Sequence, residues 1–376
     1  MRSLGLYLHI PFCRSKCLYC DFCSFPRPDG ETLDAYVTAL CRDLVRRSED
    51  CRAHTVDTVY LGGGTPTLLS ADQLARLTET VFSSYHVSDG AEITAECNPK
   101  TGGREQFFGM RRAGFNRLSI GLQSAHATEL RALGRIHSFD DFKETFLAAR
   151  EAGFSNISAD VMMGIPHQSV ESYLETLDRL CQLSPEHISA YGLTVEEGTP
   201  FGRMGDRLIL PDEETETAQY FGGIERLAAS GYRQYEISNF ARAGYESRHN
   251  LKYWNCEEYL GFGPAAHSDF AGVRFGNSRD LKAYLAGKDI TETSQSPDPD
   301  ERIAEYVMLR MRLAEGVRFS AFARRFGVTF DECFGSSLRY ANDPTLVARD
   351  GEGIAFTPAG MRVSNAILSE WLDFGK

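Results

Sequence analysis

Short apolar runs alternate with amphipathic stretches from the start of the chain to about residue 230. The apolar runs predict six strands, at Leu4–Ile10, Val56–Leu61, Ala91–Glu96, Asn116–Gly121, Asn156–Val161 and His187–Tyr191. The intervening stretches predict helices over Leu33–Arg47, Ala71–Ser84, Gly103–Ala113, Phe139–Glu151 and Val170–Cys181. Repeated strand–helix units favour a parallel sheet, either a barrel or a doubly wound layer.

The pattern changes after another predicted helix at Asp212–Ala229. An aromatic- and glycine-rich stretch follows and ends in a polar break, TETSQSPDPDE. Beyond the break, the pattern predicts helices at Glu301–Leu313, Phe319–Phe326 and Phe330–Arg339, a hairpin around Asp350–Gly353 and a last helix. We therefore expect an α/β domain over 1–230, an appended α+β segment over 231–295 that closes it, and a small winged-helix-like module over 296–376.

Functional-looking residues follow the predicted strands at the point where each ends. They are Gly62, Gly63 and Gly64 after the second strand, Glu96, Gln123 and Asp160 at the next three, and Tyr191 and Thr194 at the sixth. Ligands of parallel α/β folds gather at the carboxyl ends of the strands. The sequence therefore predicts one binding rim there.

Four cysteines crowd into the loop after the first strand, in HIPFCRSKCLYCDFCSF. Cys13, Cys17 and Cys20 form a C-x3-C-x2-C pattern, and Cys23 follows. Thiolates at this spacing can hold an iron–sulfur cluster, whereas four of them could also form a structural zinc site. A zinc ribbon usually joins two separated cysteine pairs, so the spacing favours the cluster; a reactive or incidental thiol group is the third reading.

Charge and composition exclude several classes of protein. The formal net charge is −12, which argues against nucleic-acid binding, because phosphate contacts need a basic face. No apolar run approaches the roughly 20 residues that span a bilayer. Clustered thiols without a secretory signal indicate metal or redox chemistry in the cytoplasm.

The cysteine pattern resembles the signature of the radical S-adenosylmethionine (SAM) superfamily. The resemblance extends through YLHIPFC, YLGGGTPTLL, AECNP, NRLSIGLQS, LGRIHS, DVMMGIPHQS and GFGPAAHS. In this order the motifs resemble the oxygen-independent coproporphyrinogen III oxidases and their relatives, the haem chaperones. The resemblance implies a partial (β/α)6 radical SAM barrel with the C-terminal module of that group.

The same resemblance implies the cofactors and their ligands. Cys13, Cys17 and Cys20 would hold a [4Fe–4S] cluster whose fourth iron binds SAM, and a flavodoxin- or ferredoxin-type electron donor would reduce it. The implied SAM contacts are Tyr7, Tyr19, Gly63, Gly64, Thr65, Glu96, Gln123, Arg135, Asp160, Thr194 and His267. Backbone at the glycines can approach the ligand closely because they carry no Cβ.

Two features favour the haem-chaperone branch over the oxidases. The oxidases carry a cysteine two positions after the third ligand, where this chain has Phe22, and Cys23 is interpreted as an incidental thiol. His249 begins HNLKYW, which resembles the H-N-x-x-Y-W pattern of the chaperones, so we expect it to contact haem. The expected function is delivery of haem to acceptor apoproteins. A coproporphyrinogen oxidase, or a radical SAM methyltransferase or cyclase, remains an alternative.

Overall fold

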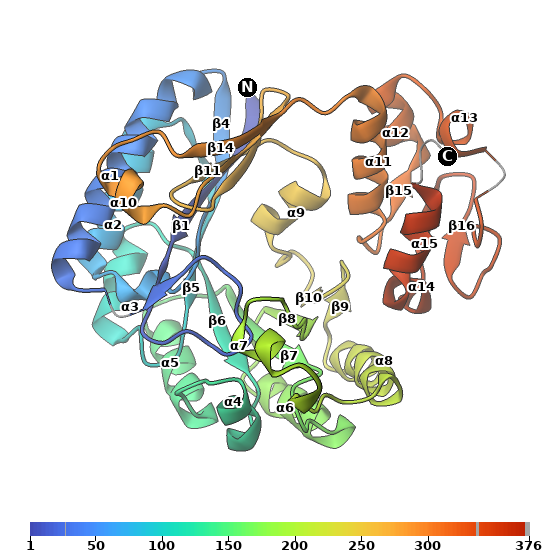
Figure 1. The fold of residues 1–376 in the computed structure, drawn as a ribbon, viewed down its shortest axis with the longest axis horizontal. Helices are drawn as coiled ribbons and strands as arrows, with labels where there is room; N and C mark the ends of the chain where they lie inside the picture. Colours follow the sequence, from blue (N-terminus) through green and yellow to red (C-terminus); the bar gives the residue numbers. More distant parts are fainter. Residues whose placement is uncertain (27, 336–337, 373–376) are drawn as a thin grey trace.

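A computed structural model describes residues 1–26, 28–335 and 338–372, and within these ranges one 12-stranded sheet organises the molecule (Figure 1). Its central strands run parallel in the order expected for a barrel, each beside its neighbour in the sequence. They are β1 (Arg2–Ile10), β4 (His54–Gly63), β5 (Val87–Cys97), β6 (Arg117–Gln123), β7 (Ile157–Met163) and β8 (His187–Gly192). The expected partial (β/α)6 barrel is therefore confirmed.

Helices cover the outer face of these strands, as Figure 1 shows. They are α1 (Gly30–Ser48), α2 (Ala71–Ser84), α3 (Arg104–Arg112), α4 (Ala127–Ala132), α5 (Phe139–Glu151), α6 (Val170–Cys181) and α8 (Glu213–Ala229). Serines start three of them at the predicted residue, because Ser70, Ser138 and Ser169 each form a reciprocal capping box. A short parallel pair, β2 (Phe12–Cys13) and β3 (Phe25–Pro26), brackets the cysteine loop, and α7 (Pro200–Met204) follows β8.

The segment 231–295 extends the sheet at both edges. At one edge β10 (Asn239–Ala241) pairs with β8, and β9 (Arg233–Gln234) pairs with β10. At the other, β11 (Tyr259–Phe262) runs parallel to β1 and continues into the antiparallel strands β12 (His267–Phe270), β13 (Val273–Asn277) and β14 (Thr291–Gln295). We call β11–β14 the extension. A domain boundary at residue 231 stays a prediction, since the sheet is continuous across it.

Two further helices belong to this segment. The helix α9 (Arg248–Trp254) carries the HNLKYW run and packs against β4, and it lies on the inner side of the sheet in Figure 1. The helix α10 (Leu281–Leu285) connects β13 to β14 and packs against α1. One apolar core joins β1 to the extension, with buried residues from Leu4 to Ile290.

The C-terminal module has a core of its own, which includes Val307, Phe322, Ile354 and Trp371. Its elements are α11 (Pro299–Arg310), β15 (Val317–Arg318), α12 (Phe319–Phe326), α13 (Phe330–Phe334), β16 (Val347–Arg349), β17 (Gly353–Phe356), α14 (Pro358–Arg362) and α15 (Ser364–Trp371). The predicted hairpin is confirmed by the antiparallel pair β16–β17.

Two predictions in this module are wrong. The helix expected to reach Arg339 ends at Phe334, because Gly335 adopts a positive φ of 64° that breaks the helix; residues 336 and 337 lie outside the described part. The expected last helix is two short helices, divided at Val363. Among the described helices, none is long and apolar enough to cross a membrane.

Candidate functional site

The three predicted cluster ligands lie on one loop at the carboxyl end of β1. All three cysteines are partly exposed, and the backbone N–H of Cys20 donates to the carbonyl of Cys17 at 3.3 Å. Two of the thiols have donors from other elements. Thr65 Oγ1 lies 3.7 Å from Cys13 Sγ, and Arg135 Nη1 lies 3.5 Å from Cys17 Sγ. The structure thus brings five predicted residues into one polar site.

The donor set of this loop fits an iron–sulfur cluster. Burial raises the pKa of Cys13, and it raises the pKa of Cys20 to about 11, so cluster binding must displace their protons. Hydrogen-bond donors such as Thr65 and Arg135 favour thiolate ligands, because they stabilise charge on sulfur. Within the described ranges, no three His, Cys, Asp or Glu side chains already stand as ligands for a single metal ion.

The glycine loop after β4 packs directly against the base of the cysteine loop. A Cβ at Gly64 would lie 2.5 Å from the carbonyl oxygen of Phe12, so only glycine allows this approach. Gly63 has a φ of 106°, and its N–H donates to Glu96 Oε2 at 3.0 Å. The loop therefore links the cysteines to the carboxylate at the end of β5.

Two half-buried carboxylates occupy the predicted rim. Glu96 accepts from Tyr60 Oη at 2.9 Å, and Asp160 accepts from Ser119 Oγ at 3.0 Å. Burial, reinforced by the charge of Asp160, raises the pKa of Glu96 to about 7, and burial also raises the pKa of Asp160. A ligand with a cationic group or with hydroxyl groups would stabilise the charged form of these carboxyls.

Asn98 joins the two sides of the site and was not among the predicted site residues. Its Nδ2 donates to Thr65 Oγ1 at 2.8 Å, and its Oδ1 accepts from Arg135 Nη2 at 2.7 Å. Arg135 also donates to the carbonyl of Gly121 at 2.8 Å, while its buried Nε has no partner among the described residues. The AECNP motif contains Asn98, so its position after Glu96 was the available signal.

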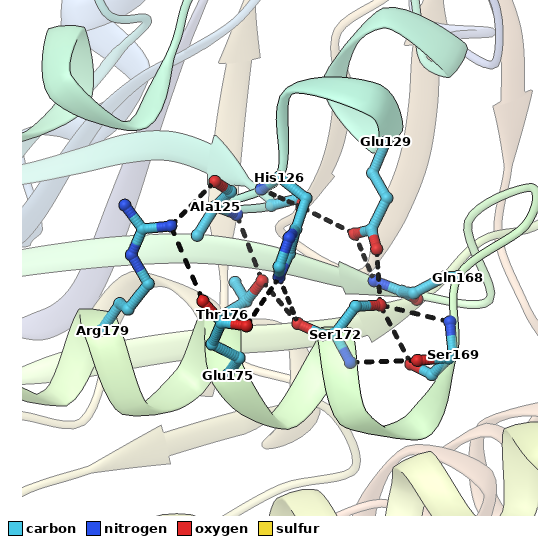
Figure 2. A network of polar contacts seen from close by, with 10 residues as sticks. Ala125, His126, Glu129, Gln168, Ser169, Ser172, Glu175, Thr176 and Arg179 are labelled. Carbon is cyan, nitrogen blue, oxygen red and sulfur yellow. Dashed lines mark hydrogen bonds and ion pairs between the residues drawn. The ribbon is translucent and has the colours of Figure 1, made fainter.

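A buried polar network anchors the helix that precedes Arg135 (Figure 2). Glu129 of α4 accepts from Ser172 Oγ and Ser124 Oγ, each at 2.6 Å, and from Gln168 Nε2 at 3.0 Å. These contacts fasten α4 to α6 and to the loops after β6 and β7. Because the backbone N–H of Arg135 donates to the carbonyl of Leu130 in α4, the network positions the backbone from which the Arg135 side chain extends.

The remaining rim residues differ in how they are held. Gln123 ends β6 with a φ of 68° and accepts from Tyr191 Oη at 2.8 Å, so it is fixed at the rim. Tyr19 packs beside Tyr191 against the apolar group of Leu133, Met162, Ile165 and Phe201. Thr194 is exposed just beyond β8. Its role as a SAM contact stays a prediction.

A hydrogen-bond chain ties β1 to the far end of the cysteine loop. Tyr7 Oη and His9 Nδ1 are 2.9 Å apart, and His9 Nε2 is 2.9 Å from the carbonyl oxygen of Cys23. Cys23 itself is buried, whereas its neighbour Phe22 is 68% exposed. Cys23 therefore serves the loop through its backbone carbonyl.

His249 lies inside the protein with both ring nitrogens engaged. Nδ1 is 2.8 Å from Thr58 Oγ1, and Nε2 is 2.8 Å from Tyr253 Oη. The ring is 1% exposed and stacks on Tyr60, with centroids 5.2 Å apart. In this conformation both nitrogens are occupied, so haem contact by His249 stays a prediction that requires at least one of these hydrogen bonds to break.

The other predicted histidine lies at a different surface. His267 is exposed on β12, and its ring lies over Gly276 of β13. Together with Tyr7 it lines a cavity of about 570 Å³ between the cysteine loop and the extension. The structure therefore places the predicted SAM contacts in two groups, one on the rim of β4–β8 and one along this cavity.

Comparison with known proteins identifies the family. The Radical SAM superfamily model matches residues 7–180, and the HemN C-terminal domain model matches residues 298–363. The heme chaperone HemW of Bacillus subtilis is 35% identical over 97% of this chain and 98% of its own. HemW of Escherichia coli is 36% identical over 85% of this chain and 86% of its own.

A solved structure agrees with these relatives. Coproporphyrinogen III oxidase (HemN) from Escherichia coli, described as a radical SAM enzyme, superposes with a TM-score of 0.88 at 25% identity. The superposition covers 100% of this chain and 91% of that one, so it includes the barrel, the extension and the C-terminal module. The chain therefore belongs to the radical SAM family that contains the heme chaperone HemW and is related in structure to HemN.

Proposed function

We propose that the protein is a haem chaperone, which binds haem and delivers it to acceptor apoproteins in the cytoplasm. The observation that carries the proposal is the 35% identity to a heme chaperone over almost the full length of both chains. Phe22 supports it, because the oxidases resembled in sequence carry a cysteine at that position and this chain presents an exposed aromatic ring instead.

We propose further that Cys13, Cys17 and Cys20 hold a [4Fe–4S] cluster and that the rim binds SAM. When bound and reduced, such a cluster supplies an electron for cleavage of SAM. Glu96 and Asp160 would orient the polar groups of SAM, and the backbone at Gly63 and Gly64 would approach its methionine part. An electron donor of the flavodoxin or ferredoxin type belongs to the same proposal.

Thr65 and Arg135 would hold the cluster ligands in place. Both side chains donate toward cysteine sulfur, and both are fixed by Asn98. These two hydrogen-bond donors stabilise the negative charge of the thiolates, so no further ionisable side chain is needed beside the sulfurs. The chain's own residues thus bind and orient, and they leave the chemistry to the bound groups.

The experiment is a paired assay on anaerobically reconstituted protein. Hemin is titrated while the Soret band is followed, and separately the protein receives SAM, reductant and coproporphyrinogen. We expect saturable hemin binding near one equivalent and no turnover of the porphyrinogen. Catalytic formation of protoporphyrinogen would instead establish the oxidase, the alternative that the superposition on HemN favours.

A further inference from the structure

The cavity between the cysteine loop and the extension is built from four parts of the chain. Tyr7 and His9 of β1 line it, and so do Phe22 and Cys23 of the cysteine loop. The rest of the lining includes Tyr253, Tyr259, His267, Arg279 and Glu292, together with Asp21. Its volume of about 570 Å³ lies in the range of roughly 300–1,000 Å³ that small-molecule sites occupy.

Aromatic rings give the cavity surfaces suited to a flat ligand. Phe22 is largely exposed there, and Tyr253 and Tyr259 pack edge to face with ring centroids 4.6 Å apart. Tyr253 belongs to the HNLKYW run, so this motif borders the cavity through its tyrosine. An apolar, planar molecule could cover these rings and gain from their burial.

The hydrogen bonding of the ring nitrogens distinguishes His267 from the other candidate haem ligands, His9 and His249. Both ring nitrogens of His9 and of His249 are hydrogen bonded. Among the described contacts, the His267 ring has no hydrogen-bond partner, and it is exposed where it lines the cavity. A ring nitrogen can therefore bind iron without first losing a protein partner.

A cation lies at the same cavity. Arg279 pairs with Asp21 at 3.6 Å, and both side chains are more than half exposed, so the pair is weak. Its guanidinium can turn to a carboxylate of a ligand, where it would form a planar two-pronged contact. Asp21 and Glu292 are the acidic groups that face it in the lining.

We propose that this cavity is the haem site, with His267 as the iron ligand, the tyrosine and phenylalanine rings against the porphyrin, and Arg279 near a propionate. The proposal rests on the proposed haem-chaperone function and adds its location. Because Tyr7 and His267 are also predicted SAM contacts, haem here would lie beside the SAM rim and would border the cysteine loop through Phe22 and Cys23.

The test is hemin titration of the full reconstituted protein and of His267→Ala. We expect the variant to bind hemin about tenfold more weakly or worse, with a shifted Soret band, because the axial imidazole is lost. Millimolar imidazole should restore the wild-type band. The matched control is His86→Ala, an exposed histidine between α2 and β5 at the opposite end of the sheet, which should titrate like the wild type.

A second variant keeps the proposal falsifiable if His267→Ala disturbs the extension. Arg279→Glu changes an exposed side chain, and we expect it to weaken hemin binding several-fold while the Soret position stays unchanged. The control is Arg52→Glu, because Arg52 is 80% exposed and does not line the cavity. Unchanged affinity and spectrum in both His267→Ala and Arg279→Glu would overturn the proposed location.

The outcomes also separate the location from the function. Saturable hemin binding by the wild type with no effect of either variant leaves the haem chaperone standing and removes this site. Absence of saturable binding by the wild type removes both. Loss of SAM binding in His267→Ala with unchanged hemin binding would assign His267 to SAM alone, and it would equally overturn the proposal.

Discussion

The rim of β4–β8 and the extension β11–β14 border the same cysteine loop but are held very differently. On the rim, Glu96 and Arg135 are half-buried, and each has at least two hydrogen-bond partners. On the extension side, His267 and Arg279 are exposed, and Arg279 has one weak ion pair. A preorganised rim suits a resident cofactor, whereas adaptable side chains suit a cargo that must leave again.

The largest expected effect is the loss of the cluster when a ligand in the cysteine loop is removed. Cys17→Ala removes the thiol that faces Arg135, and three ligands are the minimum for the proposed cluster. We expect iron and sulfide content near background and loss of the broad visible absorption after reconstitution. The control is Cys23→Ala, which should keep both. Wild-type iron content in Cys17→Ala would contradict the ligand assignment.

A smaller effect is expected at the rim carboxylate. Glu96→Gln removes a charge that would bind the amino group of SAM, and we expect SAM affinity to fall by roughly 10–100-fold. Isothermal titration with SAM under anaerobic conditions measures it. Glu105→Gln, an exposed residue on α3, serves as the matched control.

The pH dependence sharpens the same prediction. Since burial raises the pKa of Glu96 to about 7, the carboxyl is protonated below that pH and must lose its proton to bind a cation. As the pH is raised towards 7, SAM affinity should therefore increase by up to about tenfold per pH unit, and above pH 7 it should level off. Glu96→Gln should flatten this profile; an equally steep profile in the variant would assign the dependence to another group.

The smallest effect on binding is expected at His249. His249→Ala leaves the buried hydroxyl of Thr58 and the half-buried hydroxyl of Tyr253 without a partner and opens a cavity, so we expect a loss of about 2–4 kcal/mol in unfolding free energy. Urea unfolding measures this loss. The hemin Soret position should stay that of the wild type. A shifted band with unchanged stability would show that His249, and not the extension, binds iron.

Much of the barrel could be predicted because local signals agreed with the final fold. Alternating apolar runs marked β1 and β4–β8, and serine caps fixed the starts of α2, α5 and α6. The strands of the extension escaped prediction because they are short: β11, β12 and β13 lie in the glycine- and aromatic-rich stretch, and β14 lies in the stretch interpreted as a polar break. In addition, β11 finds its partner in β1, which is distant in the sequence. The helix α13 was predicted to be too long because the helix-ending effect of Gly335 was underestimated.

The functional site, like the fold, could be predicted only in part. Motifs identified the cysteines and the rim residues, since those positions follow strand ends. Asn98 and Tyr60 were missed because their importance lies in what they contact, which sequence spacing does not reveal. The direction in which His249 points was likewise beyond reach, because the packing of α9 against β4 decides it.

The pairing of β1 with β11 has a consequence for how the chain is made. Gly5 lies beside Tyr259, so β1 waits for a strand that is synthesised 254 residues later. Until then one edge of β1 has unpaired backbone groups, a template on which other chains can aggregate. Such distant pairing also slows folding, since a long loop must close first. Synthesis therefore passes through a vulnerable stage that ends when the extension docks.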